Sequence, residues 1–177
     1  MGNLNSPLQQ INEYDVALCV FCNRHSRNRF IRHFFRLISR LGDGVFWYAL
    51  MCILLLKFQA AALPAVLHML AAALFGTLTY KLIKGKTLRP RPFNVYPAIV
   101  CTGKTLDQFS FPSGHTLHAV SFSLISVYYF PALMPLVLPF TLLVALSRPV
   151  LGLHYPSDVI AGAALGAVIA LTSIQLI

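Results

Sequence analysis

The chain has 177 residues, of which 57% are hydrophobic and only 11% are charged. Soluble domains carry about 25% charged residues. This composition therefore excludes an ordinary soluble domain and predicts an integral membrane protein with a single domain over residues 1–177. Lysine and arginine outnumber aspartate and glutamate by 14 to 5. In a membrane protein this charge favours the lipid bilayer and a phosphorylated membrane lipid as partners, and not nucleic acid.

Residues 1–44 comprise a polar start and a basic amphipathic segment. Between residues 15 and 41, apolar side chains recur at three- and four-residue spacing with arginines between them. This pattern predicts a helix that lies in the membrane interface and does not cross the bilayer. We expect Gly42-Asp43-Gly44 to end that helix. The polar start lacks the layout of a signal peptide.

Apolar stretches that could each cross a membrane follow within residues 45–177. They cover residues 45–59, 62–81, 116–130, 133–146 and 159–176. Several are shorter than the roughly 20 residues that a span needs, so we expect flanking residues to complete them. Gly162 and Gly166 form a GxxxG frame in the last stretch, which predicts close helix packing. The predicted fold class is all-α: a polytopic membrane helix bundle of about five transmembrane helices plus an N-terminal interfacial amphipathic helix.

Threading the chain through five spans places its polar segments at one membrane face. These segments are the interfacial helix, the loop over residues 84–115 and the turn over residues 147–158. The short turns near residues 60 and 131 fall on the other face. Because segments distant in sequence converge there, we expect the functional site at the basic face.

The loop over residues 84–115 has the features of an anion-binding site. Lys84 and Arg91 supply positive charge, and Ser113-Gly114-His115 stands directly before a predicted helix. Cations and the backbone amides at a helix N-terminus together favour phosphate. The other cations of the loop are interpreted mainly as solvated or head-group-facing charges: Lys86, Arg89 and Lys104.

The turn near the C-terminus brings a histidine between two charges. Arg148 and Asp158 are the only charged residues after residue 116, and His154 lies between them. A neutral histidine is a competent nucleophile, and a carboxylate on its other ring nitrogen fixes the tautomer. Pro156 is expected to begin the last helix, so that Asp158 stands in its first turn and can reach back to His154.

The two clusters together indicate phosphoryl transfer through a phosphohistidine intermediate. His154 would attack phosphorus, and His115 would protonate the departing oxygen as a general acid. Lys84, Arg91 and Arg148 would hold the charge of the transition state by positioning and electrostatics.

No metal or other cofactor is expected. The carboxylates do not cluster as a magnesium site requires; they are Glu13, Asp15, Asp43, Asp107 and Asp158. Cys19, Cys22 and His25 resemble half of a zinc site, but no second ligand pair completes it. Small apolar residues on an interfacial helix are the better interpretation of these cysteines.

Three motifs in this region resemble the signature of the type 2 phosphatidic acid phosphatase (PAP2) superfamily. A lysine, six residues and Arg-Pro are matched by Lys84 and Arg91-Pro92, and Pro-Ser-Gly-His is matched by residues 112–115. Ser-Arg, five residues, His, three residues and Asp are matched by Ser147-Arg148, His154 and Asp158. All three motifs match in order and without substitution.

The resemblance implies roles for these residues. His154 would be the nucleophile, Asp158 its orienting partner and His115 the acid on the leaving group. The implied phosphate ligands are Lys84, Arg91, Ser113, Gly114 and Arg148. The aromatic residues that bracket the loop are candidate lipid contacts: Phe93, Tyr96, Phe109 and Phe111. Many bacterial members have six spans, whereas this chain replaces the first with the interfacial helix.

The predicted function is a metal-independent lipid phosphate phosphatase of a bacterial inner or plasma membrane. Undecaprenyl diphosphate is the preferred substrate; phosphatidylglycerophosphate and phosphatidic acid remain open, as does phosphate transfer to an acceptor other than water. The intact His154, Asp158 and His115 disfavour a lipid-binding protein without activity. The oligomeric state is not predicted.

Two further features leave alternatives open. The site face holds thirteen of the fourteen Lys and Arg residues, so the positive-inside rule predicts a cytoplasmic site, whereas the resemblance implies a periplasmic one. His68 is expected to make a helix–helix hydrogen bond. His118 is expected to pack between helices, and facing the site is the alternative.

Overall fold

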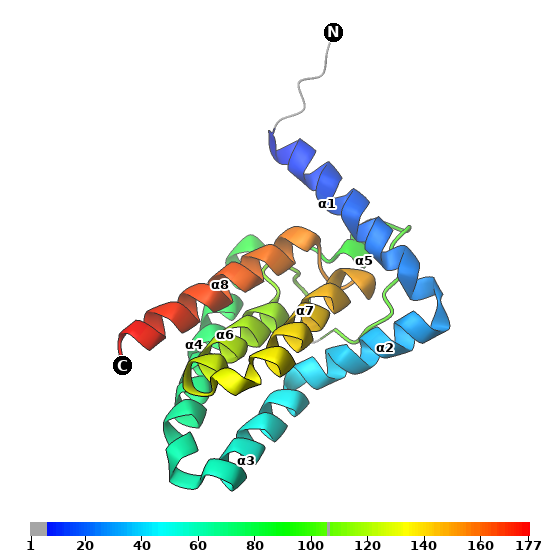
Figure 1. Ribbon diagram of the computed structural model, residues 1–177. Coiled ribbons are helices and arrows are strands. Elements are labelled where there is room, and N and C mark those ends of the chain that lie inside the picture. Colours follow the sequence, from blue (N-terminus) through cyan, green and yellow to red (C-terminus); the bar gives the residue numbers. More distant parts are fainter. Residues whose placement is uncertain (1–6, 106) are drawn as a thin grey trace.

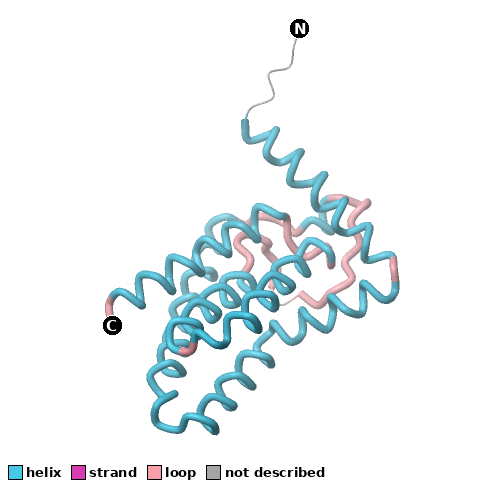
Figure 2. Tube along the Cα trace, viewed as in Figure 1, coloured by secondary structure: helices cyan, strands magenta, loops and turns pink. Residues whose placement is uncertain are grey.

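The structure is a computed structural model that describes residues 7–105 and 107–177, and within these ranges it consists of helices and connecting loops (Figure 1). The α-helices are α1 (Pro7–Arg24), α2 (Arg29–Arg40), α3 (Phe46–Phe58), α4 (Leu63–Thr87), α5 (Pro92–Val95), α6 (Gly114–Tyr129), α7 (Met134–Val150) and α8 (Pro156–Gln175). Figure 2 shows that most of the loop residues gather at one end of the bundle, beside α5. The three site motifs lie at that end.

The N-terminal segment is two helices, so the single helix predicted over residues 15–41 is wrong in that respect. The short turn η1 (His25–Arg27) separates α1 from α2. Asn28 has an extended backbone, and its side chain accepts a hydrogen bond of 2.8 Å from the backbone nitrogen of Phe30. Asparagine is a favoured N-cap because its side chain satisfies such free N–H groups. This cap begins α2, and α1 projects away from the bundle (Figure 1).

The Gly-Asp-Gly sequence bends the chain instead of ending the helix in a loop. Residues Leu41–Val45 form a wide helical turn, η2, that connects α2 directly to α3. Gly44 has φ +130°, a conformation that residues with a Cβ rarely adopt. A Cβ on Gly42 would lie 3.0 Å from Val144 of α7. The bend is therefore held closely against α7, with Asp43 between its two glycines.

Helix α6 lies at the centre of the bundle and packs against α8, α4 and α7. Its contact with α8 is especially close. A Cβ on Gly162 would collide with the carbonyl oxygen of Ser113, and one on Gly166 with that of Leu117. The close packing predicted from the GxxxG frame is confirmed, and it ties α8 to the beginning of α6.

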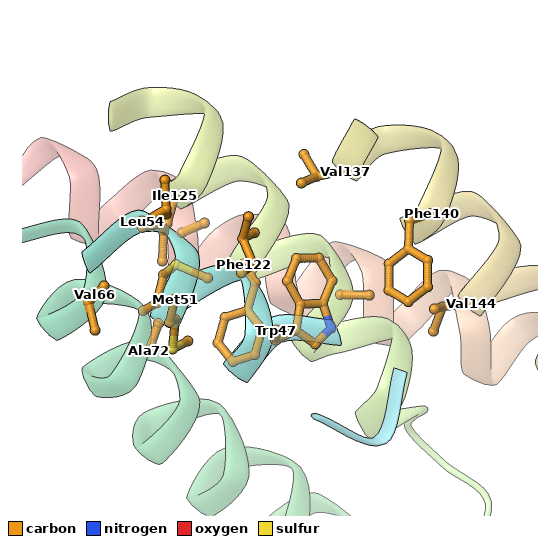
Figure 3. Packing of buried hydrophobic residues seen from close by; sticks show 14 of the residues in the cluster. Trp47, Met51, Leu54, Val66, Ala72, Phe122, Ile125, Val137, Phe140 and Val144 are labelled. Atoms are coloured by element: carbon orange, nitrogen blue, oxygen red, sulfur yellow. The ribbon is translucent and has the colours of Figure 1, made fainter. Parts of the chain in front are cut away.

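The core lies where α3, α4, α6 and α7 meet (Figure 3). Trp47 of α3 is 1% exposed and packs edge-on against Phe122 of α6 and Phe140 of α7. On the outer surface, large apolar side chains such as Leu56 stay exposed, as expected for helices that face lipid. His68 of α4 bonds Ser173 of α8 at 2.8 Å, which confirms the predicted helix–helix hydrogen bond.

The predicted membrane helix bundle is confirmed, while the number of spans stays a prediction. Each apolar stretch lies mainly in a helix: α3, α4, α6, α7 or α8. Three helical runs in the described part of the chain are long and apolar enough to cross a membrane. They are Arg29–Thr87, which runs through α2, α3 and α4, then Pro131–Val150 and Pro156–Gln175.

Candidate active site

A cavity of about 230 Å³ opens between η2, α3, α4 and α6 at the loop end of the bundle. Its polar end is lined by Lys84, Arg91, Asp107, His115 and His154. Its other end is lined by apolar side chains, including Trp47, Ala73 and Phe122. The three motifs therefore contribute to one cavity that joins a cationic end to an apolar one.

His154 lies in the short loop between α7 and α8 and is 2% exposed. Nη1 of Arg91 donates to the carbonyl oxygen of Leu153 at 2.8 Å and lies 3.4 Å from Nε2 of His154. Arginine can only donate, so this contact requires a lone pair on Nε2. Nδ1 lies 3.5 Å from Oδ2 of Asp158, longer than a usual hydrogen bond. The geometry fits a neutral imidazole with its proton on Nδ1.

The surroundings of His154 favour that neutral form. Burial lowers the pKa of His154 well below its ordinary value, and the positive charges of Arg91, Lys84 and Arg148 lower it further. Both causes act against the charged imidazolium. The lone pair of Nε2 is therefore available at neutral pH.

Asp158 stands in the first turn of α8, as predicted, with Pro156 at the start of the helix. Its Oδ2 accepts a hydrogen bond of 2.9 Å from the backbone nitrogen of Tyr155. Its carbonyl oxygen accepts one of 3.0 Å from the backbone nitrogen of Ser113. These bonds hold the carboxylate next to His154, and they join the Pro-Ser-Gly-His motif to the motif that contains His154 and Asp158.

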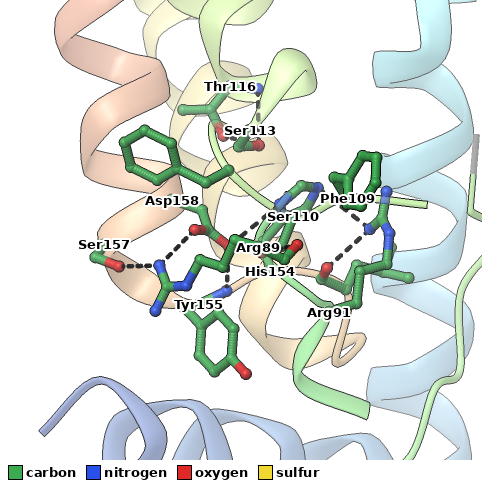
Figure 4. A network of polar contacts seen from close by, with 12 residues as sticks. Arg89, Arg91, Phe109, Ser110, Ser113, Thr116, His154, Tyr155, Ser157 and Asp158 are labelled. Carbon is green, nitrogen blue, oxygen red and sulfur yellow. Dashed lines mark hydrogen bonds and ion pairs between the residues drawn. The ribbon is translucent and has the colours of Figure 1, made fainter. Parts of the chain in front are cut away.

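Arg89 holds the other side of Asp158 (Figure 4). Its Nη1 donates to Oδ1 of Asp158 at 2.7 Å, its Nη2 pairs with Asp15 of α1 at 2.7 Å, and its guanidinium lies 4.0 Å from the ring centre of Tyr155. The interpretation of Arg89 as a solvated or head-group-facing charge is wrong. Sequence spacing could not reveal this contact, because it depends on how α1 packs on α8.

Lys84 and Arg91 share a carboxylate that the sequence analysis did not assign to the site. Lys84 Nζ contacts Asp107 Oδ2 at 2.7 Å, and Arg91 Nη2 contacts Asp107 Oδ1 at 2.8 Å. Burial works against ionisation of Asp107, but these two cations outweigh it, so its pKa lies below the ordinary value. A carboxylate thus lies between the two cations predicted to bind phosphate.

The Ser-Gly-His motif forms the start of α6. Ser113 is the N-cap, with its side chain accepting from the backbone nitrogen of Thr116. Its own backbone nitrogen is bonded to Asp158, so Ser113 is engaged in holding the two motifs together. The amides of Gly114 and His115 follow in the same turn, where the helix itself offers no acceptor. Gly114 and His115 both line the cavity.

Arg148 is 1% exposed at the end of α7. Its Nε and Nη2 donate to the side-chain oxygen of Ser147 at 3.0 and 2.9 Å. It is not among the residues that line the cavity. Its charge nevertheless acts on His154 and Asp43, which both line the cavity.

Asp43 brings a second carboxylate to the cavity, opposite His115. Its Oδ1 pairs with Nε2 of His115, across 72 positions of sequence. The site therefore holds two His–carboxylate pairs, one local in sequence and one formed only by the fold. A lone aspartate between two glycines is read as a turn in sequence, which is why the sequence analysis missed it.

The aromatic residues around the cavity differ from those predicted. Phe93 and Tyr96 pack with α1 against Cys19 and Tyr155, and none of the four predicted aromatics, which include Phe109 and Phe111, lines this cavity. Phe93 and Phe109 line a second cavity of about 420 Å³, which shares Arg91 and Asp107 with the first. Those that line the first cavity come from the helices: Trp47, Tyr48, Tyr80 and Phe122. The sequence signal for them was weak, since aromatic residues in apolar helices are ordinary core residues.

His118 combines both roles considered for it. It lines the cavity, its Nε2 contacts Thr77 at 3.3 Å, and its ring stacks on Phe122. It is packed between α4 and α6 and also faces the site.

Comparison with known proteins agrees with this geometry. The family model described as the PAP2 superfamily matches residues 65–177. The chain belongs to the PAP2 superfamily. The match extends from α4 to the C-terminus and includes all three motifs, so the family predicted from the motifs is confirmed.

Two curated relatives are named as phosphatases. A decaprenylphosphoryl-5-phosphoribose phosphatase of Mycobacterium tuberculosis is 42% identical over 88 residues, which cover 50% of this chain and 48% of the relative. The match thus spans about half the length of that relative. An undecaprenyl-diphosphatase of Sulfolobus acidocaldarius is 29% identical over 143 residues, 78% of this chain and 67% of the relative.

Two solved structures share the PAP2 fold. Aquifex aeolicus LpxE superposes with a TM-score of 0.78 at 24% identity and covers 90% of this chain and 94% of its own. A transmembrane PAP2-type phosphatidylglycerolphosphate phosphatase from Bacillus subtilis gives 0.74 at 24% identity, covering 98% and 87%. These likenesses concern the fold alone and support a transmembrane bundle.

Proposed function

We propose that this PAP2 protein is a metal-independent lipid phosphate phosphatase that works through a phosphohistidine intermediate. The observation that carries the proposal is the single cavity in which Nε2 of His154 stands beside Lys84 and Arg91 while the far end is apolar. A phosphate at the cationic end would leave the attached chain beside Trp47 and Phe122. This arrangement suits an amphiphile with its phosphate at head-group depth.

In the proposed reaction, His154 attacks phosphorus with the lone pair of Nε2. The bond from phosphorus to the leaving oxygen breaks, and that oxygen takes a proton from His115. Asp158 steadies the positive charge that develops on the His154 ring. Water then loses a proton to His115 and attacks phosphorus, which releases inorganic phosphate and restores His154.

The phosphate would be held by charge and by backbone amides. Lys84 and Arg91 would exchange the carboxylate of Asp107 for phosphate oxygens, with the amides of Gly114 and His115 at the N-terminus of α6. Arg148 does not line the cavity, so it would stabilise the phosphate only through its positive charge. These cations supply the neutralisation that a metal ion provides in other phosphoryl transfers, so we expect activity to survive EDTA.

The proposed substrate class is a polyprenyl phosphate derivative, with undecaprenyl diphosphate preferred. The apolar end of the cavity fits a lipid chain, and two relatives carry polyprenyl substrates in their names. A decaprenylphosphoryl phosphoribose is the second candidate, because of the 42% identity to the phosphatase named for it. Phosphatidylglycerophosphate and phosphatidic acid are the glycerolipid alternatives.

The proposed location is the inner or plasma membrane of a bacterium, with the site facing the cytoplasm. The argument is the positive-inside rule, since Lys57 is the one Lys or Arg assigned to the opposite face. Five spans would then place Ile177 outside the cytoplasm. A reporter fused after Ile177 tests this: activity of the reporter in the cytoplasm would contradict the assignment.

The experiment is phosphate release by detergent-purified protein in EDTA, with His154→Ala as control. The panel is undecaprenyl diphosphate, decaprenylphosphoryl-5-phosphoribose, phosphatidylglycerophosphate and phosphatidic acid. Release that survives chelation and is abolished in the variant supports the proposal, and the ranking names the substrate. Acid quench with labelled substrate should trap phosphate on wild-type protein only. No release above the variant, with folded protein, would overturn the proposal.

A further inference from the structure

We propose that Asp43 is a positioning residue that orients His115 and stabilises its imidazolium form when this histidine acts as the general acid. The proposal rests on the proposed phosphatase function and adds a residue that lies outside the three motifs. Its basis is the direct contact between Oδ1 of Asp43 and Nε2 of His115.

The contact is built into the fold. Asp43 lies in η2, where φ +130° at Gly44 turns the chain, and Gly42 packs against Val144 of α7. The carboxylate is thus presented to the cavity from a fixed bend, and both Asp43 and His115 line that cavity. The side chain of Asp43 is 29% exposed and that of its partner His115 is 13% exposed, so the contact lies at the solvent-accessible side of the cavity.

The charges around His115 explain why it needs a carboxylate. From α7 it faces the cation Arg148; from α6 it faces His118; and His154 lies across the cavity. Burial, followed by the positive charge of Arg148, lowers the pKa of His115 to about 4, because both disfavour a positive charge on the imidazole. Asp43 is the carboxylate among the described residues that contacts the ring, and it favours the imidazolium.

The pairing also assigns the proton that is transferred. An imidazolium has protons on both ring nitrogens, and Asp43 accepts from Nε2. The proton that reaches the leaving oxygen is therefore the one on Nδ1. The P–O electron pair stays with that oxygen, and the ring becomes neutral with the proton on Nε2 still hydrogen-bonded to Asp43. In the second half of the reaction, Nδ1 recovers a proton from the attacking water.

The test compares Asp43→Asn with wild type on two synthetic amphiphiles. Dodecyl phosphate has an alkoxide leaving group that needs a proton, whereas 4-dodecyl-2-nitrophenyl phosphate leaves as a stabilised phenolate. General acid catalysis contributes about 10²–10⁴-fold. We expect kcat of Asp43→Asn to fall about 100-fold or more on the alkyl ester and less than about tenfold on the aryl ester, with KM changed little. Glu13→Gln removes an exposed carboxylate and should match wild type on both.

A double variant and a pH profile complete the test. Asp43→Asn combined with His115→Asn should be no slower than His115→Asn alone, because residues that act as one unit are not additive. The alkaline limb of kcat should lie at lower pH in Asp43→Asn than in wild type, because the carboxylate raises the pKa of His115. Equal loss of kcat on both esters, losses that multiply in the double variant, or an alkaline limb at the same pH in Asp43→Asn and wild type would overturn the role of Asp43. Wild type that hydrolyses neither ester nor any lipid would instead overturn the phosphatase itself.

Discussion

Arg89 donates a hydrogen bond of 2.7 Å to Oδ1 of Asp158, while Oδ2 of the same carboxylate faces Nδ1 of His154 at 3.5 Å. Asp158 is fully buried, and a buried carboxylate without a partner costs considerable free energy. Burial raises the pKa of Asp158, and the guanidinium of Arg89 opposes that rise while it orients the carboxylate next to the histidine. Because Arg89 also binds Asp15, the same arginine attaches α1 to this pair.

Replacing Arg89 should slow catalysis without abolishing lipid binding. A hydrogen bond to a charged group contributes about 1.5–3 kcal/mol, which corresponds to roughly a 10- to 100-fold loss in kcat for Arg89→Gln. Steady-state kinetics on the preferred lipid measures it. The matched control is Lys86→Gln, which removes an exposed cation in the last turn of α4. A variant with wild-type kcat would show that Asp158 does not need this partner.

Replacing Asp107 should strengthen binding of inorganic anions. Its carboxylate lies between Lys84 and Arg91 and, with a lowered pKa, stays ionised down to pH values below its ordinary pKa of 3.8. Phosphate must therefore compete with it at every working pH. We expect Asp107→Asn to lower the inhibition constant for phosphate by about tenfold, which is 1.4 kcal/mol.

The control for this prediction is Glu13→Gln, which makes the same change of net charge elsewhere. Inhibition is measured against hydrolysis of the preferred lipid at pH 7. A weaker inhibition in Asp107→Asn than in wild type would show that Asp107 supports the anion site instead of competing for it.

The pH dependence should reflect a nucleophile that stays neutral. Protonation of Nε2 would block attack by His154. Since its pKa lies well below 6.5, lowering the pH through 6.5 leaves the imidazole unprotonated, and kcat/KM should not fall there on account of His154. The profile of kcat/KM reports free-enzyme groups.

The substrate must be accounted for in the same profile. A phosphate monoester has its own second ionisation at about pH 6. ³¹P NMR of the lipid micelles measures that pKa directly. An acid limb at pH 6.5 or above that the substrate does not explain would contradict the lowered pKa of His154.

Gly162 should not tolerate a methyl group. A Cβ there would collide with the carbonyl oxygen of Ser113, so Gly162→Ala must push α6 from α8 and separate Ser113 from Asp158. Overpacking of this kind costs about 1–3 kcal/mol. We expect a lower Tm in detergent together with lower activity. Gly85→Ala in α4 is the control, because a Cβ at Gly85 meets no atom within 4 Å; equal melting of both variants would contradict the prediction.

The sequence by itself determined the class of protein, the helices of the bundle and the two motif clusters. Low charge and long apolar stretches predict helices in lipid, because a helix satisfies its backbone groups within one segment. His154 and Asp158 are four residues apart with Pro156 between them, so local geometry alone places the carboxylate near the ring. The GxxxG frame of Gly162 likewise predicted a close contact, although not its partner.

Only the tertiary structure decided the partners that come from distant parts of the chain. Asp43 reaches His115, Asp107 reaches Lys84, and Asp15 reaches Arg89. Each carboxylate looks like an ordinary polar residue in sequence, because nothing in its neighbours specifies which cation or histidine it will meet. The meeting depends on the bend at η2, the course of the loop and the docking of α1. The packing of whole helices determines these three features, and the spacing of residues in the sequence does not encode that packing.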